Sequence, residues 1–199
     1  LVQYADNGKL LPRGACSGGY SFIMSGCPAT SLLVSTYMKD LMKKTKPSHA
    51  YEAIKRNHAP GGMMSYESAD DLKFYVKKGY CPGNAGKTLE WAFQDWGLSR
   101  MALRMGKKSD AALYEKRSRA WTPLFNKNIG LILPKKENGE WLHTDPLNGQ
   151  GWVEANAWQA TWSVSHDLPK LVELMGGGDA FCEKLNYAFE QARPTDFVH

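Results

Sequence analysis

The chain has 199 residues, of which 43% are hydrophobic and 23% are charged, the ordinary balance of a folded globular protein with one core. The formal net charge of +5 comes from scattered lysine pairs and not from a long basic run, so we do not expect nucleic-acid binding. No segment approaches the roughly 20 apolar residues of a membrane span, so no membrane-spanning helix is expected.

The four cysteines form no Cys-x-x-Cys pair, which argues against a zinc ribbon or a thioredoxin-like site. Cys16 and Cys27 are the only pair close in sequence, and the disulfide state of these two, of Cys81 and of Cys182 stays open. The chain begins at Leu1 and shows no signal peptide, so we expect a processed product or a fragment of a longer protein.

The first 27 residues are glycine-rich and carry no sustained period, so a loop is expected there after a short helical tail at residues 2–4. A helix is predicted from Pro28 to the lysines at 43 and 44, because apolar side chains recur every three or four residues. A second helix is expected to open at Ser48, with that serine as its cap, and to stop before residues 60–62.

Three more helices follow in the middle of the chain. Helical spacing covers residues 68–78, ended by Gly79, then 88–105 and 110–126. The helix at 88–105 carries apolar residues on two sides, which predicts burial over most of its circumference.

The helical period breaks at residues 129–152. A strand at 129–134 and a turn through 137–141 predict a small inserted β-hairpin. Helical spacing returns at 153–164 and 168–175, a last helix follows Asp179 as its cap, and residues 193–199 are expected to be loop. The pattern is mainly α, an α/α toroid or an irregular helical bundle.

Residues 151–167 combine three tryptophans with several polar groups, which suits neither a plain core nor a solvated face. Aromatic platforms beside a few placed polar groups are typical of a pocket for a sugar or another polar small molecule. The candidate residues are Trp152, Glu154, Asn156, Trp158, Gln159, His166 and Asp167.

Structural roles compete with these assignments. Glu154 suits a solvated helix N-terminus, and Asn156 and Gln159 suit bonds to the neighbouring backbone. Asp167 precedes a helix at Leu168 and suits an N-cap. Glu90 and Asp95, on the long helix, are expected to form salt bridges more readily than to support a pocket.

Several motifs occur together along nearly the whole chain. They are M-S-G-C-P-A at 24–29, A-Y-E-A-I at 50–54, Y-V-K-K-G-Y at 75–80, T-L-E-W-A-F-Q-D-W at 88–96, E-A-N-A-W-Q at 154–159 with T-W at 161–162 and H-D at 166–167, and L-V-E-L-M-G-G-G at 171–178. With them the chain resembles the catalytic part of glycoside hydrolase family 92, calcium-dependent exo-acting α-mannosidases that invert the anomeric configuration. Ala155, Ala160 and Ser165 depart from the family pattern, and Ala160 removes an aromatic ring near the site.

The resemblance implies a partial (α/α)6 toroid with a small β-hairpin, in which residues 1–199 form a single region. It places the general acid on Glu154, and the other six candidates are then expected to bind substrate. It also implies that the family's N-terminal β-sandwich and C-terminal catalytic segment are absent from this chain, which makes it a fragment.

An inverting glycosidase needs a second carboxylate roughly 6.5–9.5 Å from the acid to activate water. No segment resembles the family's motif for this base, so we expect the isolated chain to be inactive. The resemblance also implies calcium as a cofactor. Calcium is coordinated by six to eight oxygen ligands, so we expect these ligands to lie outside this chain. We therefore assign no metal ligand among its residues.

The resemblance further implies hydrolysis of terminal α-linked mannose from glycans, N-glycans included, in an extracytoplasmic protein, secreted or periplasmic. The partners are then an α-mannoside glycan and the remainder of the same polypeptide. The alternative is a non-catalytic helical carbohydrate-binding or scaffold module.

Overall fold

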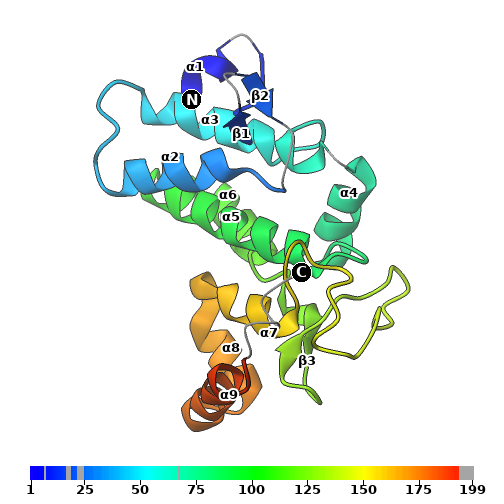
Figure 1. The fold of residues 1–199 in the computed structure, drawn as a ribbon. Coiled ribbons are helices and arrows are strands. Elements are labelled where there is room, and N and C mark those ends of the chain that lie inside the picture. Colours follow the sequence, from blue (N-terminus) through cyan, green and yellow to red (C-terminus); the bar gives the residue numbers. More distant parts are fainter. Residues whose placement is uncertain (7, 17–18, 22–24, 67, 193–199) are drawn as a thin grey trace. The chain divides into compact units, whose positions relative to one another are not determined.

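The structure is a computed structural model that describes residues 1–6, 8–16, 19–21, 25–66 and 68–192. It is mainly helical, as the sequence predicts, and its described residues include two short antiparallel strand pairs (Figure 1). The chain divides into two compact units, Leu1–Gly79 with Glu90–Ala120 and Tyr80–Leu89 with Trp121–His199. None of the described helices is long and apolar enough to cross a bilayer. Residues 22–24 and 193–199, expected to be loop, lie outside the described residues.

The first unit consists of helices joined by loops. Its elements are α1 (Val2–Ala5), β1 (Gly14–Cys16), β2 (Gly19–Ser21), α2 (Pro28–Met38), α3 (Pro47–Asn57), the 3₁₀ turn η1 (Met63–Ser65), α4 (Ala69–Lys78), most of α5 (Ala85–Arg104) and α6 (Lys108–Arg117). The antiparallel pair β1–β2 lies in a stretch expected to be loop, because strands of three residues are too short to show a period.

The ends of these helices test the predictions directly. Pro28 opens α2 and Gly79 ends α4 in the left-handed conformation, both as predicted. Helix α2 is shorter than expected, because Asp40 adopts a φ of 56° and Arg104 binds the carboxylate of Asp40 at 2.7 Å. The cap at Ser48 is wrong, since α3 already begins at Pro47.

Helix α6 is also shorter than the predicted helix at 110–126. It ends at Arg117, and the short turn η2 (Thr122–Leu124) follows. Pro123 lacks an N–H group and lies in the first turn of η2, so it suits the start of a new turn better than the interior of one continuous helix.

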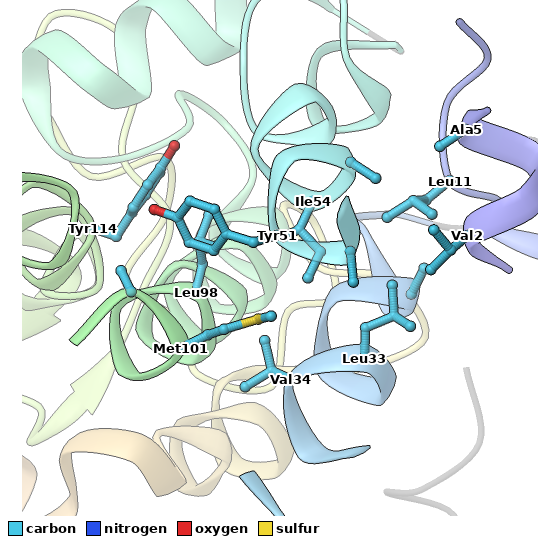
Figure 2. Close-up of a cluster of buried hydrophobic side chains, with 14 of the residues drawn as sticks. Val2, Ala5, Leu11, Leu33, Val34, Tyr51, Ile54, Leu98, Met101 and Tyr114 are labelled. Atoms are coloured by element: carbon cyan, nitrogen blue, oxygen red, sulfur yellow. The ribbon is translucent and has the colours of Figure 1, made fainter. Parts of the chain in front are cut away.

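The apolar core of the first unit lies between α1, α2, α3, α5 and α6 (Figure 2). Its buried side chains are Val2, Ala5, Leu11, Ala29, Leu33, Val34, Ala50, Tyr51, Ala53, Ile54, Leu98, Met101, Ala102, Ala111 and Tyr114. The rows of apolar residues spaced by three and four in the sequence therefore face one another, which is the burial that stabilises amphipathic helices.

A buried polar network accompanies this core. Asp95 of α5 is fully buried and accepts hydrogen bonds from Arg117 Nε at 2.8 Å and from the Tyr75 hydroxyl at 2.9 Å. The Asp95 carboxylate also lies 2.8 Å from His58 Nδ1, and His58 Nε2 lies 2.9 Å from the hydroxyl of Thr30. Asp95 thus forms the salt bridge expected of it, within the protein interior and not on a helix surface.

The partners of His58 fit a neutral imidazole. Nδ1–H donates to Asp95, Nε2 accepts from Thr30, and Arg117 already balances the charge of the carboxylate. Burial lowers the pKa of His58 below its ordinary value, although the hydrogen bond to Asp95 acts in the opposite direction.

The lowered pKa of His58 predicts that stability falls in mild acid. Above about pH 6.5 the imidazole is neutral in the folded and unfolded states, and its contribution is complete. As the pH falls below that value the unfolded state takes up the proton first, so the contribution is lost at up to about 1.4 kcal/mol per pH unit. Urea unfolding at pH 7.5 and pH 5.5 should therefore show a larger loss for the native sequence than for His58→Asn, and equal losses would contradict the assignment.

The second unit contains short elements and two longer helices. They are η2, β3 (Phe125–Asn126), β4 (Leu131–Ile132), α7 (Ala157–Ala160), the 3₁₀ turns η3 (Thr161–Ser163) and η4 (Ser165–Asp167), α8 (Leu168–Met175) and α9 (Gly178–Gln191), together with the first turn of α5. Helix α8 is as predicted. Asp179 lies in the first turn of α9, while the N-cap position belongs to Gly177.

The predicted turn back through residues 137–141 is present, but the strand before it also pairs with a strand that was not predicted. β4 pairs with β3 before it, in the register Phe125↔Ile132, because Asn126 and Gly130 form the tight turn between them. The following segment, residues 133–142, folds back on itself through an antiparallel bridge between Lys135 and Trp141 and through the amide of Leu142, which donates to the carbonyl of Pro134. We call residues 133–142 the arm.

The helix predicted at 153–164 is wrong in its first part. Residues 151–156 are not helical, and α7 begins only at Ala157. The apolar spacing across 153–164 is shared by a non-helical connection, a short helix and a 3₁₀ turn, so the period alone did not locate the helix start.

Candidate active site

Glu154 lies on the short connection between Trp152 and α7. Its side chain is exposed. Its φ is 50°, and Asp40 is the only other described residue besides glycine with a positive φ. Such a backbone costs on the order of 1 kcal/mol and persists where the surroundings impose it, which occurs most often at functional sites.

The loop before Glu154 is held by its own hydrogen bonds. Nε2 of His143 lies 2.8 Å from the carbonyl of Gln150, and the amide of Gln150 donates to Oδ1 of Asn148 at 2.8 Å. The amide of Trp152 donates to the carbonyl of Gly149 at 3.2 Å. These turns fix the backbone that enters the connection.

The segment after Glu154 is fixed by a capping box. Oδ1 of Asn156 accepts from the amide of Gln159 at 3.1 Å, and Oε1 of Gln159 accepts from the amide of Asn156 at 2.9 Å. The amide of Ala157 also donates to the carbonyl of Pro146 at 3.1 Å. Both amide side chains predicted to bind sugar therefore bind the backbone at the start of α7, as the competing interpretation holds.

Trp152 and Trp158 occupy different environments. Trp152 is 8% exposed, and its buried indole N–H has no hydrogen-bond partner among the described residues. Trp158 packs on α9, with its ring 5.6 Å from that of Tyr187 and 5.1 Å from Lys184 Nζ. Burial lowers the pKa of Lys184, which donates to the carbonyl of Ile129 at 2.5 Å.

His166 and Asp167 form the turn η4 that leads into α8. Asp167 stands at the N-cap position of α8 as predicted, but its side chain makes no capping hydrogen bond. One carboxylate oxygen of Asp167 is buried without a hydrogen-bond partner among the described residues.

A calcium site is not assembled by the residues that the structure describes. Within them, no three His, Cys, Asp or Glu side chains come together in a way that could hold a metal ion. Calcium requires six to eight oxygen ligands, so this part of the chain does not fit a complete site.

The described cysteines likewise belong to no metal-binding group. Cys27 and Cys81 are buried, Cys182 is exposed, and none of these three is in a disulfide. The thiol of Cys27 donates to the carbonyl of Asn57, and burial raises the pKa of this thiol, so it stays protonated. Cys27 is thus outside any disulfide.

The chemistry available at this connection is proton transfer by one exposed carboxyl group. A backbone fixed on both sides limits the directions in which that group can deliver a proton, and direction governs general acid catalysis. Sequence reasoning proposed Glu154 as a candidate but did not identify the residues that fix its loop, His143 and Pro146. The capping-box spacing of Asn156 and Gln159 is the one signal that would have located the start of α7.

The chain matches known proteins over nearly its whole length. The model of the glycosyl hydrolase family 92 catalytic domain matches residues 1–198. Among curated proteins, the chain is 25% identical over 212 residues to an uncharacterized secreted glycosidase of Arthroderma benhamiae, covering 86% of this chain and 27% of that protein.

The solved structures that share the fold include two family GH92 enzymes. A family GH92 inverting mannosidase from Bacteroides thetaiotaomicron matches with a TM-score of 0.83 and 30% identity, covering 93% of this chain and 26% of that one. A family GH92 α-mannosidase from the same organism matches with a TM-score of 0.81 and 25% identity, covering 94% and 25%. The chain thus spans about a quarter of the length of the proteins it matches.

Proposed function

Because the chain belongs to glycosyl hydrolase family 92, we propose that it is part of the catalytic domain of an α-mannosidase that removes terminal α-linked mannose from glycans with inversion. In this proposal Glu154 is the general acid that protonates the leaving oxygen. The likeness to an inverting mannosidase and to an α-mannosidase supports the substrate and the stereochemistry. The likeness to a secreted glycosidase supports an extracytoplasmic location.

The observation that carries the proposal is the backbone of Glu154. An exposed carboxyl on a left-handed residue other than glycine, between a hydrogen-bonded loop and a capping box, is costly to maintain. Residues other than glycine that are held in this conformation cluster at functional sites. A proton donor gains from the fixed direction.

The partner carboxylate is proposed to come from the remainder of the polypeptide. An inverting glycosidase holds its acid and base roughly 6.5–9.5 Å apart with water between them. We therefore propose that the 199 residues are inactive alone and that the rest of the domain supplies the base, any calcium ligands and the helices that would close a toroid.

The stereochemistry of hydrolysis tests the proposed function. The full-length protein, incubated with methyl α-mannoside or an α-linked mannobiose, should release β-mannose first, followed by slow mutarotation. Proton NMR of the anomeric signals in the first minutes measures this. Initial release of α-mannose would contradict inversion, and saturable mannose binding without turnover would support a non-catalytic module instead.

A further inference from the structure

Gly151 is enclosed on the side where any other residue would carry its side chain. A Cβ atom built there would lie 2.7 Å from Pro134 Cβ, 2.8 Å from Pro134 Cγ and 3.0 Å from the carbonyl oxygen of Gly83. Its φ of 86° is in the left-handed region that favours glycine. The backbone here occupies a position that any other residue could take only by displacing its neighbours.

The carbonyl oxygen of Gly151 is held in place by hydrogen bonds. It accepts the amide of Ala85 at 2.8 Å and that of Gly86 at 3.4 Å, two amides at the start of α5. The first amides of a helix have no partner within the helix, so Gly151 satisfies groups that would otherwise be unpaired. The amide of Gly83 donates to the carbonyl of Lys135 at 2.6 Å, which ties the loop before α5 to the arm.

The three segments that meet at Gly151 enclose one end of the connection that carries Glu154. A Cβ on Gly86 would lie 3.5 Å from the amide nitrogen of Val153, so the first turn of α5 is in contact with this connection. The capping box at Asn156 fixes the other end. Any displacement of Gly151 must be absorbed by the residues between these ends, and Glu154 is one of them.

We propose that Gly151 is a positioning residue for Glu154, and that its contact with Pro134 of the arm sets the direction of the acid carboxyl. The inference rests on the proposed role of Glu154 as general acid. A side chain at position 151 would push the connection away from the arm and turn the carboxyl away from the leaving oxygen. Misplacing a catalytic group by about 1 Å can cost about 100-fold in rate.

The test compares two substrates of the full-length protein, an α-linked mannobiose and a dinitrophenyl α-mannoside. The first leaving group needs a proton and the second does not, so the ratio of their kcat values reports general acid catalysis. A smaller fraction of folded enzyme lowers both kcat values equally and leaves the ratio unchanged. Gly151→Ala should lower the ratio about 10- to 100-fold.

Gly139 provides the matched control. It lies in the arm with a φ of 89°, and a Cβ there would meet nothing within 4 Å. Gly139→Ala therefore introduces the same kind of backbone strain without the collision, and the ratio should not change.

Pro134→Gly tests the contact itself. It removes both proline atoms that a side chain at 151 would meet, so in the Gly151→Ala background it should move the ratio back toward the native value. If Gly151→Ala does not yield folded protein, Pro134→Gly alone removes one wall of the enclosure and should lower the ratio below that of Gly139→Ala.

The outcomes separate the inference from the proposed function. The inference fails if Gly151→Ala lowers both kcat values equally or leaves both unchanged while Glu154→Gln still lowers the ratio. If Glu154→Gln leaves the ratio unchanged, the role of Glu154 fails and the inference fails with it.

Discussion

Replacing Glu154 by glutamine in the full-length protein is expected to lower kcat for an α-linked mannobiose by about 10²- to 10⁴-fold, the usual contribution of a general acid. Glutamine keeps the size and polarity of the side chain and loses the transferable proton. The exposed position of Glu154 makes it unlike a core residue, so the variant should fold normally. Steady-state kinetics with a circular dichroism spectrum for each variant measures both effects.

A comparison of kcat for two leaving groups distinguishes the loss of the general acid from general damage to the site. A dinitrophenyl group departs without a proton, so Glu154→Gln should lower kcat for the dinitrophenyl α-mannoside by less than about tenfold. Glu173 of α8 is the control, because it is an exposed carboxylate that pairs with Lys170. Glu173→Gln should leave kcat for both substrates unchanged. Full activity of Glu154→Gln on the mannobiose would contradict the assignment of Glu154 as general acid.

Replacing Asp95 by asparagine is expected to give the largest loss of stability, about 3–5 kcal/mol. Asp95 is fully buried, and its carboxylate balances Arg117, whose side chain is 10% exposed. An asparagine keeps the shape and leaves the guanidinium without a counter-charge in the interior. Chemical denaturation of the full-length protein, followed by tryptophan fluorescence, measures the loss.

Two comparisons show whether buried charge is the cause. Asp40→Asn removes an exposed partner of Arg104 and should cost about 0–1 kcal/mol. Arg117→Met added to Asp95→Asn removes the charge left unpaired, so the double variant should be more stable than Asp95→Asn alone. Additive losses from the two substitutions would show that Asp95 acts through packing and not through its charge.

Much of the helical framework could be predicted from the sequence. The long helix α5, the stop at Gly79 and the proline that opens α2 follow from spacing and from residues with fixed backbone preferences. The predictions failed where a partner distant in sequence ends an element, and Arg104, which binds the loop after α2, is an example. They also failed where strands are too short to show a period, which is the case for β1–β2.

The candidate site likewise has features that the sequence predicted and features that it did not. The order of Trp152, Glu154, Asn156 and Gln159 is a sequence motif, and it identified the carboxyl group without the fold. The commitment of Asn156 and Gln159 to a capping box, the packing of Trp158 on α9 and the left-handed backbone of Glu154 were not predicted.

The sequence by itself determined the family, the mainly helical class and the residue proposed as the acid, because motifs and apolar periods depend on residues near one another in the chain. The tertiary structure alone decided that Asp95 pairs with Arg117 and His58 in the interior. It also decided that Gly151 lies against Pro134 and the start of α5. These groups are separated by many residues in sequence, so only the folded chain brings them within reach of the short-range forces that fix a charge or the direction of a side chain.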